Sequence, residues 1–103
     1  MEDGNNNLNN LNNIQSINEQ FLRYSKDIKN CKTLSNDELL KLYGLYKQAI
    51  VGKNTTIKPS IFNYKGLLKW NAWTSESDLT QLEAKQEYIT LANNLLNKIN
   101  NQQ

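Results

Sequence analysis

The chain has 103 residues and a formal net charge of +2, which is room for one domain. It contains no histidine and a single cysteine, Cys31, so histidine bases, histidine–zinc sites and an intramolecular disulfide are excluded. No apolar run is long enough to span a bilayer, and the first residues lack the apolar core of a secretory signal. We therefore expect a cytoplasmic protein with no metal site and no stable membrane insertion.

The charge is distributed unevenly along the chain. Residues 21–70 carry ten lysines and arginines against three acids, whereas both flanking segments are net acidic. A basic middle of this kind indicates an anionic partner, and a solvated lysine face is an equally good explanation on charge alone.

The N-terminal segment has an unusual composition. Residues 5–13 read NNNLNNLNN, which offers no charge and little to bury. Such a tract is typical of disorder. The sequence therefore predicts a disordered, asparagine-rich extension over residues 1–15 and one domain over residues 16–100.

Apolar spacing from Ile17 onward predicts helices. Ile17, Phe21, Tyr24 and Ile28 recur at intervals of four and three residues, so they predict a first amphipathic helix. Residues 29–34 break that pattern. Ser35 followed by Glu38 is a capping-box signal, and the helix that it begins is expected to end near Gly52.

Two further helices follow a long loop. Residues 52–63 contain the only proline, Pro59, and predict an ordered loop of a length that usually has a function. A third helix is expected over residues 64–74 and a fourth from Thr80, with Glu83 at its capping-box position, to about residue 100. With no strand-like alternation, the sequence predicts an all-α, four-helix domain.

The apolar residues of the second helix cover a wider part of its circumference than packing against a single surface requires. On a helical projection Leu42, Leu45 and Ala49 fall together, and a second group adjoins them, consisting of Leu39, Tyr43, Tyr46 and Ile50. Lys47 lies at the edge of that second group. One group is expected to face the core and the other to line something else, although a tyrosine stripe with a snorkelling lysine is also ordinary core packing.

The third helix adds two lysines on one face. Lys65 and Lys69 are four residues apart with no acid between them, a pairing that costs a few tenths of a kcal/mol in an isolated helix. A bound anion would reverse the sign of that cost.

These motifs resemble the acyl-CoA-binding protein family. The resemblance covers about residues 21–99 and is carried by Leu42-Tyr43-x-x-Tyr46-Lys47-Gln48-Ala49-x-Val51-Gly52, by Lys65-Gly66-x-x-Lys69-Trp70-x-Ala72-Trp73 and by Tyr88-Ile89. It implies an up-down-down-up four-helix bundle that binds long-chain acyl-CoA esters with high affinity. Such a protein would serve as an intracellular carrier and buffer in lipid transport and metabolism. It would not be an enzyme, would need no cofactor and would act as a monomer.

The resemblance also implies roles for individual residues. Tyr43, Lys47 and Lys69 match the positions that hold the ribose 3′-phosphate, and Tyr46 and Tyr88 match aromatic positions against the nucleotide and acyl chain. The head-group and acyl-groove positions are matched by the following residues: Lys29 and Lys65 for the head group, Phe21 and Tyr24 for the groove. Tyr24 departs from the small residue that is usual there, so we expect it to narrow the groove, and Lys53 replaces a common acid.

Two other functional classes compete with this interpretation. A helical module that binds nucleic acid or protein would use the same basic segment, but the lysines are spread over three helices and no base-reading motif is present, so we expect no nucleic-acid partner. A thioesterase is less well supported, because Cys31 has no histidine to activate it and is expected to be a buried apolar residue.

Overall fold

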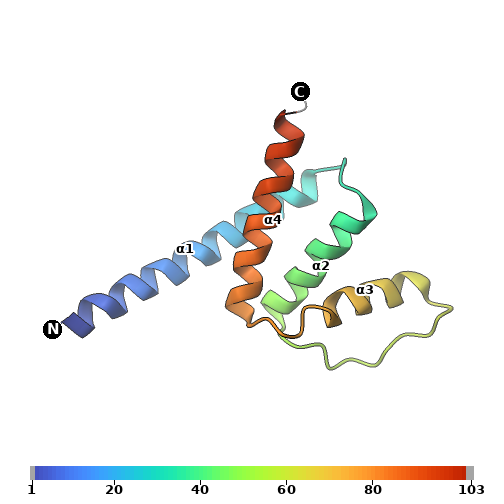
Figure 1. Cartoon of the computed structure of the whole chain (residues 1–103), viewed down its shortest axis with the longest axis horizontal. Helices are drawn as coiled ribbons and strands as arrows, with labels where there is room; N and C mark the ends of the chain where they lie inside the picture. Colours follow the sequence, from blue (N-terminus) through green and yellow to red (C-terminus); the bar gives the residue numbers. More distant parts are fainter. Residues whose placement is uncertain (1, 102–103) are drawn as a thin grey trace.

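The computed structural model describes residues 2–101, with side chains from residue 11 onward. Within that range it has four helices and no strand: α1 (Glu2–Asn30), α2 (Asn36–Ile50), α3 (Tyr64–Thr74) and α4 (Gln81–Asn101). Helix α4 packs against both α1 and α2, and α3 packs against α2. Figure 1 shows α2 and α4 running in opposite directions. The expected all-α, four-helix fold is confirmed.

Local hydrogen bonds determine where α2 and α4 begin. The Glu38 backbone N–H donates to the Ser35 hydroxyl at 3.1 Å, and the Ser35 N–H donates to the Glu38 carboxylate at 2.8 Å. Thr80 and Glu83 form the same reciprocal pair at 3.0 and 2.9 Å. The expected capping boxes are therefore both present. The hydrogen bonds from Ser35 also lower the pKa of the Glu38 carboxyl below its ordinary value.

The C-terminus of α2 is closed by a glycine in a left-handed conformation. Gly52 has φ +93°, which residues with a side chain rarely adopt, and its N–H donates to the Gln48 carbonyl. The Gln81 side chain donates to the carbonyls of Ala49 and Ile50 at 3.1 and 3.0 Å. The end of α2 is thus tied to the start of α4.

The core lies between α1, α2 and α4. The buried apolar cluster consists of Phe21 and Ile28 from α1, Leu42, Leu45 and Ala49 from α2, and Ala84, Tyr88, Ala92 and Leu95 from α4. The first of the two predicted α2 groups is therefore the core face. Cys31, expected to be buried, is only partly so, because it follows the last residue of α1.

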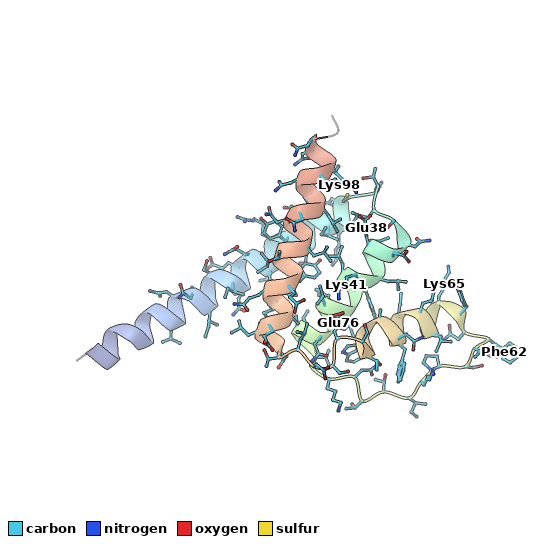
Figure 2. All side chains as sticks on the ribbon, in the orientation of Figure 1. Glu38, Lys41, Phe62, Lys65, Glu76 and Lys98 are labelled. Carbon is cyan, nitrogen blue, oxygen red and sulfur yellow. The ribbon has the colours of Figure 1, made fainter. Side chains whose placement is uncertain are left out.

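Helices α2 and α3 approach closely at Gly44. A Cβ atom on Gly44 would lie 2.3 Å from the Ala72 carbonyl oxygen, so only glycine permits this approach. Nearby, the Lys41 ammonium binds the Glu76 carboxylate at 2.5 Å, and Glu76 is only 6% exposed. Figure 2 shows Lys41 and Glu76 close together beside α2. These contacts set the spacing of α2 and α3, which carry most of the predicted site residues.

The loop between α2 and α3 is held against α3. The indole N–H of Trp73 donates to the Gly52 carbonyl at 2.8 Å, and that of Trp70 donates to the Thr56 carbonyl at 3.1 Å. The Asn54 amide donates to the Thr74 hydroxyl at 3.0 Å. Both tryptophans therefore have packing roles.

The N-terminal extension, predicted to be disordered over residues 1–15, is drawn as helix from Glu2. Helix α1 begins at Glu2 and continues without a break into the domain, and Figure 1 shows its first half projecting away from the other helices. The side chains of residues 11–16 are exposed, so these turns have no packing to stabilise them. Packing begins near Asn18, whose side-chain oxygen accepts from Lys85 at 2.9 Å. Residue 1 lies outside the described residues.

Candidate functional site

A cavity of about 650 Å³ opens between the helices, and all four contribute to it. Its apolar wall is formed largely by leucines and one isoleucine of α1, α2 and α3: Ile28, Leu39, Leu40, Leu42 and Leu68. Four lysines also line it: Lys29, Lys47, Lys65 and Lys69. No acidic side chain is among the lining residues. The arrangement is an apolar trough with a basic rim.

Two of the rim lysines lie over aromatic rings. The Lys69 ammonium is 5.6 Å from the centre of the Tyr43 ring, and the Lys47 ammonium is 4.7 Å from that of Trp73. Such contacts orient an ammonium group at modest energy and leave its N–H donors available. Tyr43 and Lys47 come from one face of α2 and Lys69 from the adjoining α3, so two ammonium groups and a phenol border the same cavity.

Three aromatic rings pack together at the site, and two of them, Tyr46 and Tyr88, line the cavity. Phe21 stacks on Tyr46 with ring centres 5.6 Å apart and meets Tyr88 edge-on at 5.0 Å, and Tyr46 is 6.2 Å from Tyr88. Burial, with a smaller contribution from Tyr46, raises the pKa of Tyr88 to about 12. Tyr88 is thus a neutral phenol at physiological pH, and the rings of Tyr46 and Tyr88 line the apolar trough at an angle of 56° to each other.

The structure places most of the predicted residues together. All seven residues expected to bind the ligand head group or nucleotide line the cavity: Lys29, Tyr43, Tyr46, Lys47, Lys65, Lys69 and Tyr88. The two predicted acyl-groove residues do not. Phe21 is buried behind Tyr46 and Tyr88, and the Tyr24 hydroxyl donates to Asn93 on α4 at 3.0 Å. Tyr24 therefore does not narrow this cavity, because its side chain is directed to α4.

Several lining residues were not singled out from the sequence. Tyr64 and Leu68 line the cavity from α3, and Ser25 and Asn36 line it from α1 and from the start of α2. Tyr64 and Leu68 are four residues apart on the helix that carries Lys65 and Lys69, so the helical repeat could have identified them. Asn36 carries no comparable periodic signal.

A second hollow of about 510 Å³ lies between α2 and α4 and has a different charge. Its lining includes Glu83 and Glu87 with Lys41, and Lys41 is already bound to Glu76. Carboxylates repel phosphate, so the main cavity is the better anion site. Among the described residues, no group of three or more histidine, cysteine, aspartate or glutamate side chains could hold a metal ion.

Comparison with known proteins shows which family this chain belongs to. Residues 18–92 match the family described as Acyl CoA binding protein. The chain belongs to the acyl-CoA-binding protein family. It is 49% identical over 72 residues to acyl-CoA-binding protein homolog 1 of Caenorhabditis elegans, a match that spans 69% of this chain and 84% of that one. It is 43% identical over 83 residues to the acyl-CoA-binding protein of Saccharomyces cerevisiae, spanning 80% and 95%.

A solved structure of the family has the same fold. The crystal structure of Oryza sativa acyl-CoA-binding protein 2 matches with a TM-score of 0.82 and 40% identity, covering 84% of this chain and 98% of the rice protein. The residues that line the main cavity, from Ser25 to Tyr88, all fall within the segment that matches the acyl-CoA-binding protein family. The exposed turns at residues 11–16 lie before that segment.

Proposed function

We propose that this protein binds long-chain acyl-CoA esters and carries and buffers them inside the cell as a monomeric, cytoplasmic, non-enzymatic component of lipid metabolism. The observation that supports this most directly is the coincidence, in one cavity of about 650 Å³, of an apolar wall with four lysines and three tyrosines of the predicted site. An amphipathic ligand with a long apolar chain and a multiply phosphorylated head group has the complementary chemistry.

The head group accounts for the basic rim. Coenzyme A carries three phosphate groups, and each charge-assisted hydrogen bond to one of them contributes about 1.5–3 kcal/mol. We assign the ribose 3′-phosphate to Tyr43, Lys47 and Lys69, which all line the cavity and of which Lys69 lies over the Tyr43 ring. Lys29 and Lys65 are assigned to the remaining phosphates, and Tyr46 and Tyr88 to contacts with the adenine ring and the chain.

The acyl chain accounts for the apolar wall. Burial of a sixteen-carbon chain is favourable by about 0.8 kcal/mol per methylene, or roughly 12 kcal/mol before immobilisation costs are subtracted. We assign its contacts to Ile28, Leu39, Leu40 and Leu68, which line the cavity. Phe21 supports this surface from behind, through Tyr46 and Tyr88. Tyr24 is not part of this assignment, because it binds Asn93.

Calorimetry with three ligands tests the proposal. Palmitoyl-CoA should bind much more tightly than free coenzyme A, because only the ester fills both parts of the cavity, and palmitate should bind weakest. No binding of the ester, or equal affinity for all three ligands, would contradict the proposal. A duplex DNA competitor should not displace the ester, whereas salt-sensitive DNA binding without competition by palmitoyl-CoA would favour a nucleic-acid module.

A further inference from the structure

The loop before α3 presents apolar side chains to solvent. We define the loop tip as residues 57–64, in which Ile57 is 93% exposed, Ile61 74%, Phe62 93% and Tyr64 68%. Figure 2 shows Phe62 at the far end of the loop, pointing away from all four helices. A soluble domain gains nothing from a fully exposed phenylalanine, and clustered apolar exposure of this kind marks a site of interaction.

The loop tip is held in an ordered conformation. The Phe62 N–H donates to the Ser60 hydroxyl at 3.1 Å, and the Asn63 N–H donates to the Ser60 carbonyl at 2.9 Å. The Asn63 side chain caps α3 by accepting from Gly66 N–H at 3.1 Å. These bonds fix the turn that directs Phe62 outward, so little ordering entropy remains to be lost on docking.

The loop tip lies in a segment of the sequence whose charged residues are all basic. Between Glu38 and Glu76 the sequence contains six lysines and no acid. Lys41 is bound to Glu76, but Lys53, Lys58 and Lys65 are exposed on the loop and at the start of α3. The Lys58 ammonium lies 5.7 Å from the centre of the Trp70 ring, and Figure 2 shows Lys65 on the α3 turn next to the loop. Apolar side chains flanked by lysines are complementary to the surface of an anionic bilayer.

We propose that the loop tip docks this protein reversibly on anionic lipid membranes. Ile61 and Phe62 enter the boundary between head groups and acyl chains, while Lys58 and Lys65 contact the phosphates and carboxylates above it. The docking is peripheral. Among residues 2–101, none of the helices combines the length and hydropathy that crossing a membrane requires. A second copy of the chain fits this surface less well, because two basic tips repel each other.

The loop tip lies next to the main cavity, so docking also positions the cavity relative to the membrane. Tyr64 belongs to the loop tip and, with Lys65, also lines the main cavity. Docking would therefore bring the cavity mouth to the bilayer surface, where amphipathic esters partition. The inference goes beyond the proposed function and does not depend on it, since Ile61, Phe62 and Lys58 do not line the cavity and interact with lipid whether or not the cavity is filled.

Vesicle flotation with the full-length chain tests the proposal. The protein should float with phosphatidylcholine vesicles that contain phosphatidylserine and much less with pure phosphatidylcholine. Phe62→Ser combined with Ile61→Ser should weaken partitioning by roughly tenfold, because two interfacial apolar contacts are removed. Lys58→Gln should weaken it by about fivefold. Leu22→Ser is the matched control, since Leu22 is 59% exposed on α1 and should leave partitioning unchanged.

Site-specific insertion and ligand binding complete the experiment. In the Phe62→Trp variant, the emission of the added tryptophan should shift to the blue when vesicles are bound and should be quenched by brominated acyl chains. The added tryptophan of Leu22→Trp should show neither change. Flotation insensitive to the loop substitutions, absence of binding to anionic vesicles, or self-association that depends on Phe62 would overturn the proposal. Palmitoyl-CoA affinity of the Ile61→Ser, Phe62→Ser chain in vesicle-free buffer should match the unmodified chain, so a failure of ester binding is recognised separately.

Discussion

The two faces of α2 differ in burial and in the chemistry that they carry. Leu45 and Ala49 are each 1% exposed and pack in the core away from the main cavity, whereas Tyr43, Tyr46 and Lys47 are only partly buried and line that cavity. Both faces are dominated by large carbon-rich side chains, so hydropathy alone does not separate them. Some helices carry apolar residues over a wider arc than packing against the core requires. The difference between the two faces of α2 shows that such an arc can combine a structural face with a ligand-binding face.

The largest expected effect comes from the core face. Leu45 is 1% exposed, so Leu45→Ala should lower the free energy of unfolding by about 2–5 kcal/mol through lost burial and a residual cavity. Chemical denaturation followed by tryptophan fluorescence measures this. In the folded fraction, the affinity for palmitoyl-CoA should stay close to that of the unmodified chain. A selective loss of affinity with stability intact would mean that the two faces are not separate.

The cavity face should respond in the opposite way. Lys69→Ala and Tyr43→Phe should each weaken palmitoyl-CoA binding by about 1–3 kcal/mol, because each removes a donor to phosphate. Melting temperature should barely change, since Lys69 is exposed and its contact with the Tyr43 ring is modest. Lys26→Ala on α1 is the matched control, an exposed lysine that does not line the cavity. If the control weakens binding equally, the rim acts only through general charge.

The starts of α2 and α4 could be predicted because local chemistry determines them. Ser35 with Glu38 and Thr80 with Glu83 form hydrogen bonds within four residues, so the sequence contains the whole interaction. The two groups on α2 follow from the helical repeat in the same way. Neither depends on how distant segments pack.

The rest of the site depends on tertiary packing. The apolar spacing on α1 puts Phe21 and Tyr24 on one face but does not say which of them reaches the cavity. Packing against α4 decides this, because it directs Phe21 behind Tyr46 and Tyr88 and turns Tyr24 toward Asn93. Gly44 could not be interpreted without Ala72, its neighbour across the interface between α2 and α3. The residues that the family motifs pick out on α2 and α3 all line the cavity, whereas Phe21 and Tyr24 on α1 do not. Helices α2 and α3 pack on each other, so their motif residues are brought to one site.

A smaller effect is expected from Tyr88 on α4, which belongs to the core and also lines the main cavity. The pKa of Tyr88 is raised to about 12 by burial, whereas a tyrosine in the unfolded chain titrates near 10. Between these values the unfolded state loses a proton that the folded state keeps, so the stability that Tyr88 contributes is present below pH 10 and is lost as pH rises toward 12. Tyr88→Phe should reduce the fall in unfolding free energy over this window. Denaturation curves at several pH values measure the difference, and an identical fall in both chains would show that Tyr88 does not titrate differently on folding.

The smallest effect is expected at residues 11–16 of α1, which contrast with both faces of α2 because their side chains are exposed. Residues 11–16 are exposed and rich in asparagine, a weak helix former, while Phe21 and Ile28 farther along the same helix are buried. We expect the amides of residues 11–16 to exchange with solvent nearly as fast as in an unstructured peptide, and those of residues 22–28 to be protected as strongly as the core.

Substitutions complement the exchange measurement. Leu11→Ser and Ile14→Ser should change the free energy of unfolding by less than about 0.5 kcal/mol, since Leu11 is 63% and Ile14 42% exposed. Protection of residues 11–16, or a loss of stability comparable to that of Leu45→Ala, would show that the extension packs on something. In that case the folded unit would begin before residue 18, where the family match now starts. Fast exchange would instead place the start of cooperative structure near the hydrogen bond between Lys85 and Asn18.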